Sequence, residues 1–321
     1  MKVSVIITAY NYASFLPSCI DSLKAQTMTD FEAIIVDDGS TDDTALVVKK
    51  CISGDDRFKY IYQANQGVST ARNTGIENTE GDFIVFIDGD DIVEDNHLAT
   101  LLAGMAEADA AMVMIAIVSG TNTEIPAERR NIFSAIPMAK RSDFASLFEN
   151  YLLSSPCDKI YDRSIIMRHG LRFDPKISYA EDLVFNLQYF SYISSIALIS
   201  VATYHYVKHN GSGTTRAHKN ISYTISKISE SIDNTLPRMT DKAYQVAFEH
   251  ILWGIINLFH KINDLSGKQR LAEIAAICSM TIYRRAINHI NNMHISRVLK
   301  FVLRTRSPHL IYGAMTLKFK R

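Results

Sequence analysis

The chain is poor in cysteine and contains no long hydrophobic run. Its four cysteines show no C-x-x-C spacing, so we expect neither a zinc site nor a disulfide framework, and a reducing compartment fits best. The longest apolar run, AAMVMIAIV at 110–118, has about half the length that spans a bilayer. The apolar stretch within the N-terminal MKVSVIITAYN is too short for a signal-peptide core. These features predict a cytoplasmic protein, or one bound peripherally to the inner face of the cell membrane.

Net charge is also absent, because 34 basic residues balance 34 acidic ones. Such a chain has no overall positive field to attract nucleic acid, so we expect no nucleic-acid partner. Proline is scarce, with seven residues, whereas 47% of the 321 residues are hydrophobic, which is typical of a globular protein. A chain of this length is expected to form one large domain, or one domain with an appendage.

The N-terminal half contains a series of short β-branched runs, each followed by residues with helical spacing. A first helix is expected at 14–26, and a second opens in GSTDDT, where Ser40, Thr41 and Asp42 are N-cap candidates. Strands that alternate with helices predict a parallel sheet covered on both faces. The expected strands lie at 3–8, 31–37, 58–62 and 82–88.

Polar residues follow each expected strand, at the edge where sheets of this kind bind ligands. The last such segment, FIDGDD at 86–91, places Asp88, Asp90 and Asp91 around Gly89. Carboxylates at alternating positions suit Mg²⁺ or Mn²⁺, which complete their coordination with phosphate oxygens. The glycine would let the turn approach a ligand closely. Alternatively, the cluster is an acidic turn that caps the next helix.

Two further segments carry chemistry suited to a nucleotide. Asp37 and Asp38 follow the second strand, where a carboxylate can accept hydrogen bonds from a base or ribose, or alternatively cap the next helix. Arg72 lies on a short helix after Gly67, where it can neutralise phosphate or pair with a surface carboxylate. Together with FIDGDD, these segments favour a nucleotide diphosphate as the partner.

The segments VSVIITAYN, IIVDDGSTDDT, NQGVSTARNTGI and FIDGDD resemble, in this order, the motifs of family 2 glycosyltransferases with the GT-A fold. The resemblance covers roughly the first 120 residues. It implies a Rossmann-like α/β fold with a mostly parallel central sheet flanked by helices. It also implies an inverting enzyme that uses a nucleotide diphosphate sugar, usually UDP-linked, with Mn²⁺ or Mg²⁺. By the same resemblance, Asp90 binds the metal, Asp37 supports its loop, and the nucleotide sugar contacts Thr8, Tyr10, Asn11, Asp38, Arg72 and Asp88.

The segment SYAEDLVFN at 178–186 opens an expected helix with Glu181 and Asp182. It resembles the E-D motif of the family, whose aspartate is usually taken as the catalytic base. We therefore expect Asp182 to deprotonate an acceptor hydroxyl and Glu181 to help position the acceptor or the base. Alternatively, both carboxylates only stabilise the first turn through the helix dipole.

Two more segments extend the resemblance. TYHYVKHNGSGT at 203–214 is similar to the family's closing loop over the donor phosphates. This similarity implies that His209 binds the metal or the diphosphate, that Lys208 contacts a phosphate, and that Ser212 donates a hydrogen bond within the loop. Lys208 does not fall where the basic residue of the family usually falls, and His209 is alternatively a solvated loop histidine. SSPCDKIYDRSII at 154–166 resembles the segment before the E-D motif, with Asp158 in place of the usual asparagine.

The resemblance divides the chain into a GT-A catalytic domain at 1–215 and a helical C-terminal region at 216–321. Within the domain, 1–120 would bind the nucleotide sugar and 121–215 the acceptor. Near the C-terminus, apolar residues lie among basic ones. They predict a basic helix that meets anionic lipid headgroups, packs on the domain, or contacts another copy in a homo-oligomer. The residues concerned are Arg297, Lys300, Phe301, Val302, Leu303, Arg304 and Arg306.

We therefore expect a hexosyl- or N-acetylhexosaminyltransferase that acts on a saccharide or a lipid-linked saccharide. Its setting would be the synthesis of capsule, exopolysaccharide or lipopolysaccharide. One rival is a sugar-nucleotide nucleotidyltransferase, although TAYNYASF lacks the glycine-rich basic loop of that class. The other is a non-catalytic scaffold that binds nucleotide sugar, against which the intact Asp88, Asp90 and Asp182 argue.

Overall fold

Strands and helices alternate in the computed structural model, which describes residues 2–177, 179–209, 220–236, 239–260, 265–293 and 295–319. The four expected strands are confirmed to within one residue at each end. Helix α2 begins at Thr44, whose N–H donates to Asp42, whereas Ser40 and Thr41 precede the helix without capping it. These elements are β1 (Val3–Ala9), α1 (Leu16–Lys24), β2 (Phe31–Asp37), α2 (Thr44–Ile52), β3 (Phe58–Tyr62), α3 (Val68–Glu77) and β4 (Phe83–Asp88).

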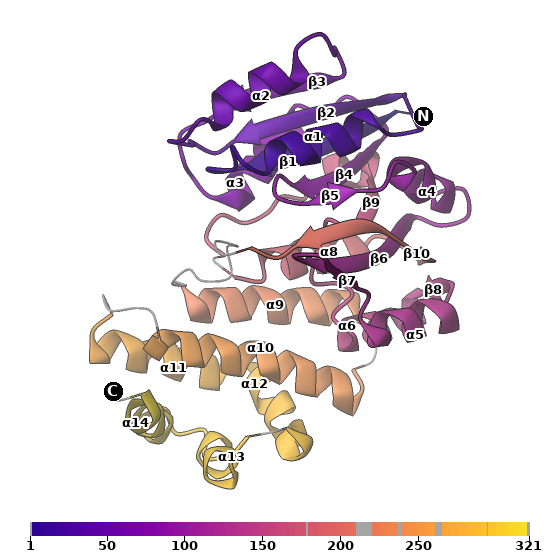
Figure 1. The fold of residues 1–321 in the computed structure, drawn as a ribbon. Helices are drawn as coiled ribbons and strands as arrows, with labels where there is room; N and C mark the ends of the chain where they lie inside the picture. Colours follow the sequence, from indigo (N-terminus) through magenta and orange to yellow (C-terminus); the bar gives the residue numbers. More distant parts are fainter. Residues whose placement is uncertain are drawn as a thin grey trace.

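A ten-stranded sheet forms the upper part of the molecule in Figure 1, with the order β3-β2-β1-β4-β9-β6-β10-β5. The long strands pair in parallel, β1 with β2 and β4, β2 with β3, and β6 with β10, which confirms the α/β class. The short strands pair antiparallel, with β7 on β6 and β8 on β10. The further strands are β5 (Ile92–Val93), β6 (Ala110–Ser119), β7 (Asn122–Glu124), β8 (Met138–Lys140), β9 (Lys159–Asp162) and β10 (Ser195–Val207).

The strand register brings the polar ends of β1, β2 and β4 to one level. Thr8 on β1 lies opposite Val36 on β2 and Asp88 on β4, and the next residue, Ala9, lies opposite Asp37. All residues of β1 and β2 are buried, because helices cover both faces of these strands. Each fully buried Val, Ile or Phe contributes about 1.5–3 kcal/mol through loss of water contact. The functional side chains therefore sit on a rigid edge.

A buried carboxylate ties β2 to its neighbours. Glu32 is 2% exposed and accepts hydrogen bonds from Ser4 Oγ (2.7 Å), the backbone N–H of Glu80 (2.7 Å) and Lys59 Nζ (3.0 Å). Burial opposes ionisation, but these hydrogen bonds and the nearby Lys2 outweigh it and lower the pKa of Glu32 to about 2. The carboxylate is therefore charged at neutral pH and forms part of the folded structure.

Helices dominate the described chain from residue 220 onward, as the sequence predicts, and stack beneath the sheet in Figure 1. Apart from a small cluster of Ile34, Val36 and Ala71, the buried hydrophobic residues form one cluster from Val3 to Met315, so these helices share a core with the sheet. Within the described residues, no helix is both long and apolar enough to cross a bilayer. The remaining helices are α4 (His97–Gly104), α5 (Ala127–Ala135), α6 (Phe144–Glu149), α7 (Arg163–Arg168), α8 (Glu181–Phe190), α9 (Ile221–Thr235), α10 (Asp241–His260), α11 (Gly267–Ser279), α12 (Thr281–Ala286), α13 (Arg297–Arg304) and α14 (Pro308–Phe319).

Helix α13 uses its apolar residues in two ways. Leu299 and Leu303 are buried in the core, whereas Val298 and Phe301 are 73% and 70% exposed. The Ser296 side chain accepts a hydrogen bond from the Leu299 N–H and caps the helix. The helix therefore packs on the protein through one side and presents an apolar side to the surface, among the basic residues that the sequence shows.

Candidate active site

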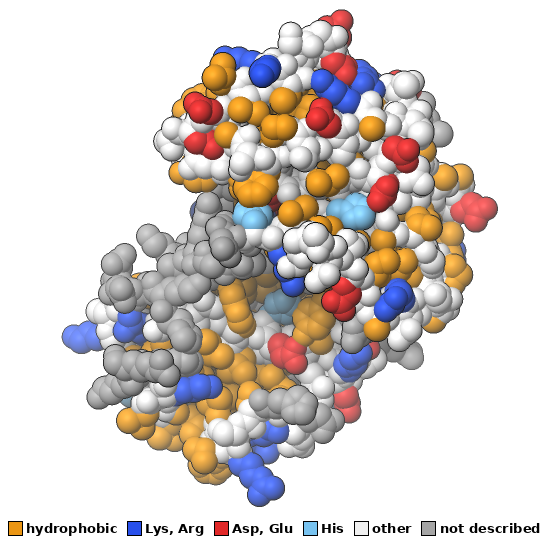
Figure 2. All heavy atoms as spheres, viewed as in Figure 1, with side chains coloured by type: hydrophobic (Ala, Val, Ile, Leu, Met, Phe, Trp, Pro, Cys, Tyr) orange, Lys and Arg blue, Asp and Glu red, His pale blue; other side chains and the backbone are white. Residues whose placement is uncertain are grey.

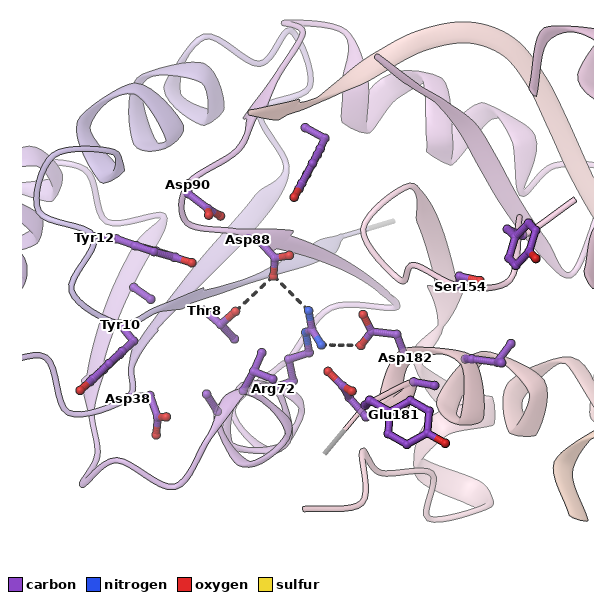
Figure 3. Close-up of a pocket in the computed structure, with 18 of the residues that line it drawn as sticks. Thr8, Tyr10, Tyr12, Asp38, Arg72, Asp88, Asp90, Ser154, Glu181 and Asp182 are labelled. Carbon is purple, nitrogen blue, oxygen red and sulfur yellow. Dashed lines mark hydrogen bonds and ion pairs between the residues drawn. The ribbon is translucent and has the colours of Figure 1, made fainter. Parts of the chain in front are cut away.

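A pocket of about 730 Å³ opens where β1, β2 and β4 end, and α8 and α10 form its other wall. Figure 3 shows Tyr10 and Asp38 at one end, Asp88 and Arg72 at the centre, and Asp182 with Ser154 beyond it on the other side. Asn11, Lys208 and His209 are not among the lining residues. The predicted site residues that do line the pocket are Thr8, Tyr10, Asp38, Arg72, Asp88, Asp90, Glu181 and Asp182.

Arg72 on α3 joins two carboxylates at the centre of the pocket. Its Nη2 lies 3.0 Å from Asp88 Oδ1 and its Nη1 lies 2.5 Å from Asp182 Oδ1 (Figure 3). The arginine is 3% exposed, and its guanidinium lies 5.1 Å from the centre of the Phe173 ring. Thr8 Oγ1 also donates to Asp88 Oδ1, at 3.4 Å. Because Arg72 forms an ion pair with each carboxylate, it holds both in position. The contact of Arg72 with a nucleotide stays a prediction.

A left-handed turn brings Asp182 into the pocket. Ala180, directly before α8, has φ 56°, and residues on both sides of it line the pocket. Glu181 and Asp182 occupy the first turn of α8, so the helix dipole also favours their charge. Burial raises the pKa of Asp182 to about 8, with Arg72 opposing the rise and Glu181 and Asp88 adding to it. A carboxylate with this pKa is suited to accept a proton near neutral pH.

Asp90, in the turn after β4, contacts His209, which follows β10. His209 Nε2 lies 2.7 Å from Asp90 Oδ2, and its side chain is 15% exposed, so it is not a solvated loop histidine. The imidazole lies against Phe15, with ring centres 4.3 Å apart, and edge-on to Tyr12. Burial, followed by the charges of Asp90 and Asp88, raises the pKa of Tyr12, which also hydrogen-bonds to Asp90. The aromatic pair therefore holds the histidine beside the carboxylate.

A divalent cation fits the donors at Asp90 and His209. A carboxylate oxygen and an imidazole nitrogen 2.7 Å apart can both reach one ion, since ligands about 2.1 Å from an octahedral ion lie about 3 Å from each other. Among the described residues, no group of three or more His, Cys, Asp or Glu could hold a metal. The protein thus offers two donors, and phosphate oxygens would have to complete the shell.

Asp38 lines the pocket at the end of β2 and accepts several hydrogen bonds from its surroundings. Its Oδ1 accepts from Gln63 Nε2 (2.8 Å) and the Gln66 N–H (2.9 Å), and its Oδ2 accepts from the Gly67 N–H (2.8 Å). A carboxylate oxygen accepts about two hydrogen bonds. One acceptor position on Oδ2 thus remains for a base or ribose, and these bonds order the loop before α3.

Asp37 and Asn11 organise the neighbouring loop. Asp37 accepts from the Ser40 N–H (2.8 Å) and from Tyr60 Oη (2.7 Å), so its predicted support of the loop agrees with the geometry. Asn11, in a left-handed conformation with φ 56°, accepts from the Thr41 N–H at 2.8 Å. Its own N–H donates to Ser40 Oγ at 2.8 Å. The Asn11 side chain therefore joins two loops outside the pocket, and its contact with the nucleotide sugar stays a prediction.

The third acidic residue of FIDGDD, Asp91, serves the fold. Asp91 is 1% exposed and accepts from Tyr204 Oη (2.5 Å) and the Val207 N–H (2.8 Å) on β10. Helix α4 begins without a side-chain cap, so the interpretation of the cluster as a helix cap is wrong. A Cβ on Gly89 would lie 2.9 Å from the Thr8 carbonyl oxygen. The glycine is therefore needed for packing of the turn on β1, and its role in the approach of a ligand stays a prediction.

Other predicted positions lie away from the pocket lining. Lys208 is exposed, its N–H donates to the Val118 carbonyl (2.8 Å), and its phosphate contact stays a prediction. Ser212 lies outside the described residues. Asp158 is buried between Arg129 (2.9 Å) and Lys159 (2.6 Å), which makes it part of a structural ion cluster.

Sequence reasoning missed one wall of the pocket and one residue near the cation donors. Tyr12 stands within TAYNYASF, two residues after Tyr10 in the same polar segment that follows the first strand, and this proximity could have suggested a place in the same site. The missed wall comes from the segment before β9 and from α10. Ser154 is the first residue of SSPCDKIYDRSII, whereas no motif marks the other members. Its members are Tyr151, Ser154, Glu249, His250 and Trp253.

The chain matches the family model described as glycosyl transferase family 2 over residues 4–170, which is more than half of its length. The putative glycosyltransferase EpsH of Bacillus subtilis (strain 168) is 30% identical over 223 residues, which is 68% of this chain and 64% of EpsH. The match thus spans less than two thirds of that relative. The uncharacterized glycosyltransferase YibD of Escherichia coli (strain K12) is 26% identical over 97% of this chain and 96% of YibD.

The fold is similar to that of S. aureus TarS. The crystal structure of TarS in complex with UDP-GlcNAc matches with a TM-score of 0.72 and 19% identity, over 99% of this chain and 92% of that chain. At this identity the likeness concerns the fold, and it confirms the predicted GT-A architecture with its helical C-terminal region. From the match over residues 4–170 and the similarity of its relatives, the chain belongs to glycosyl transferase family 2.

Proposed function

We propose that the protein is an inverting, metal-dependent glycosyltransferase that moves a sugar from a nucleotide diphosphate donor to a saccharide or lipid-linked saccharide. The observation that carries the proposal is the bridge from Asp88 through Arg72 to Asp182. It holds a carboxylate of raised pKa opposite the D-x-D turn within one pocket. The donor would lie along the strand ends, and the acceptor would approach from the side of α8.

The reaction is a single displacement at the anomeric carbon. The acceptor oxygen forms a bond to this carbon as the bond to the donor phosphate oxygen breaks. The acceptor proton passes to Asp182, and the nucleoside diphosphate leaves with the bonding electron pair. Arg72 keeps the Asp182 carboxylate in place, and Asp90 and His209 would hold the divalent ion. When bound, Mn²⁺ or Mg²⁺ would supply positive charge for the departing diphosphate.

The charge of the pocket supports a role for a cation. The lining contains several carboxylates, whereas Arg72 is its one lysine or arginine among the described residues and already contacts two of them. A diphosphate entering alone would meet net negative charge. A divalent ion beside Asp90 offsets that charge, which favours a metal-dependent donor site over a metal-free one.

We propose a UDP-linked donor that carries a hexosyl or N-acetylhexosaminyl group. The resemblance to the family, which often uses UDP-sugars, supports this choice, as does the shared fold with TarS, whose structure was determined with UDP-GlcNAc. We place the reaction in the assembly of a bacterial surface polysaccharide, such as capsule, exopolysaccharide or lipopolysaccharide.

We further propose that the C-terminal helices hold the enzyme at an anionic membrane surface. Figure 2 shows hydrophobic side chains over these helices with Lys and Arg at their margin. Phe301 on α13 and Leu317 on α14 are 70% and 76% exposed, and Lys300 lies next to Phe301 in the chain. Sedimentation with phosphatidylglycerol vesicles tests this, and equal binding of wild type and Phe301→Ala would contradict it.

The experiment for the proposed function is incubation with UDP-, GDP- and TDP-sugars, with Mn²⁺ or with EDTA, while nucleoside diphosphate release is measured. We expect release from one UDP-sugar in the presence of Mn²⁺ and none with EDTA. A parallel mixture of nucleoside triphosphates and sugar phosphates tests the nucleotidyltransferase alternative through pyrophosphate release. Pyrophosphate release, or the absence of both turnover and UDP binding, would contradict the proposal.

A further inference from the structure

The α10 side of the pocket has no assigned role, because α10 lies outside the residues that match the family model. The α10 side closes the pocket at the end that is remote from Asp38. In Figure 3, Asp182 lies between Asp38 and Ser154, and Ser154 belongs to the same wall as the α10 residues. The base or ribose end and the α10 end are therefore different parts of one cavity, and Asp182 lies between them.

Aromatic rings cover much of this end. Trp253 and Tyr151 are 43% and 44% exposed, so their rings present apolar area to a ligand. Tyr179 supports Trp253, with ring centres 4.8 Å apart at 53°. A Cβ on Gly254 would lie 2.6 Å from Tyr179 Oη, so the glycine allows α10 to approach this tyrosine. Tyr179 precedes Asp182 by only three positions, which places the aromatic group beside the proposed base.

Polar atoms accompany the rings. Tyr151 donates a hydrogen bond to Glu249 Oε2, which leaves the other Glu249 oxygen outside this bond. His250 Nε2 is buried and has no hydrogen-bond partner among the described residues, and burial lowers the pKa of His250 to about 4. The histidine is therefore neutral at pH 7. This end thus combines flat apolar faces with neutral and acidic groups, which is the combination that binds a sugar ring through its C–H face and its hydroxyls.

The charge of the lining restricts which sugar can bind. Lys and Arg are absent from the described lining on the α10 side, where Glu249 carries the charge. A phosphate or carboxylate on the acceptor would be repelled there. The carboxylates of the whole lining are those of Asp38, Asp88, Asp90, Glu181, Asp182 and Glu249.

We propose that Trp253, Tyr179 and Tyr151 form the acceptor subsite, which holds an uncharged pyranose ring of a saccharide with Glu249 accepting hydrogen bonds from its hydroxyls. The proposal rests on the proposed function and deepens it, because it names the acceptor class. It also gives the helical C-terminal region a part in the active site, as one wall of the acceptor subsite.

Fluorescence of the full-length protein tests the subsite directly, because Trp253 is the only tryptophan in the chain. The probes are neutral disaccharides (lactose, maltose, cellobiose and N,N′-diacetylchitobiose), with glucose 6-phosphate and dioleoylphosphatidylcholine vesicles as comparisons. We expect a saturable change in emission with at least one neutral disaccharide and none with the comparisons. No change with any disaccharide, or a response only to the phosphate or to the vesicles, would overturn the proposal. This readout needs no turnover, so its failure is distinct from the failure of the proposed function.

Variants provide the second readout. With the donor that the panel identifies and a neutral acceptor, Trp253→Ala should raise the acceptor KM at least tenfold and leave the UDP Kd within twofold. Glu249→Gln should raise the acceptor KM by a smaller factor. Tyr192→Ala removes an aromatic ring of similar exposure, 49% against 43% for Trp253, outside the pocket lining and should change neither constant. An unchanged acceptor KM in Trp253→Ala, or an equal rise in the UDP Kd, would contradict the assignment, and the second result would place the donor there.

Discussion

Asp182→Asn tests the assignment of the catalytic base most sharply. The amide keeps the shape of the side chain, and its oxygen can still accept a hydrogen bond from Arg72 Nη1, which lies 2.5 Å from Asp182 Oδ1. It cannot accept the acceptor proton. General base catalysis contributes about 10²- to 10⁴-fold, so the loss of transition-state stabilisation should be about 3–5 kcal/mol.

The cost to folding should be much smaller. Arg72 stays charged, so its hydrogen bond to the amide oxygen is still a bond to a charged group, within the range of about 1.5–3 kcal/mol, and the exchange should cost about 1 kcal/mol. Arg72 also keeps its contact with Asp88 at 3.0 Å. For a chain of 321 residues we expect a fall in Tm of about 1–2 °C, too small to explain the loss of transfer.

The assay measures nucleoside diphosphate release with donor and acceptor, and UDP binding by calorimetry with Mn²⁺. We expect transfer by Asp182→Asn to fall at least 100-fold, while the UDP Kd changes less than threefold. Glu181→Gln is the matched control, because it neutralises the adjacent carboxylate in the same helical turn, and its loss should be smaller. Transfer within threefold of wild type, or a UDP Kd more than tenfold weaker, would refute the role of Asp182 as the base.

Three further predictions follow from the same contacts. Because the deprotonated Asp182 is the active form and its pKa is raised to about 8, kcat should fall as pH drops below 8, and a fall beginning only near pH 4 would contradict this. Asp90→Ala should remove the Mn²⁺ dependence of UDP binding. If calorimetry of this variant still gives different UDP Kd values with and without Mn²⁺, Asp90 is not a metal ligand. Glu32→Gln should cost at most about 3 kcal/mol in urea unfolding at pH 7. That cost should shrink as pH falls from about 5 toward 2, because the lowered pKa stabilises the fold only while Glu32 is ionised. A cost that does not change with pH would refute this contribution of the ionised carboxylate.

Local pattern was sufficient for the sheet and for part of the site. The runs at β1, β2 and β4 are mostly hydrophobic and end in polar residues or are followed by them, and parallel strands bring such ends to one edge. For this reason Thr8, Asp38, Asp88 and Asp90 were predictable as members of one pocket. The same rule could not say how each carboxylate is used, since that depends on donors from other elements.

Arg72 and Asp91 show this limit. The sequence suggested either a phosphate or a surface carboxylate as the partner of Arg72, and it could not show that the fold places Asp182, 110 positions later, against the buried guanidinium. Asp91 belongs to the same acidic cluster as Asp90, yet β10 turns it into a buried acceptor of hydrogen bonds. Two adjacent aspartates thus have different roles, because different residues surround each of them in the folded chain.

By itself, the sequence determined the α/β class, the family, the strand ends and the carboxylates of the site, because these depend on hydrophobic period and on motifs within a few residues. Only the tertiary structure decided that Arg72 bridges Asp88 and Asp182, that His209 meets Asp90, and that α10 forms a wall of the pocket. These contacts join residues far apart in the chain. They arise because one shared core packs the C-terminal helices against the sheet, and no local pattern records which side chains that packing brings together.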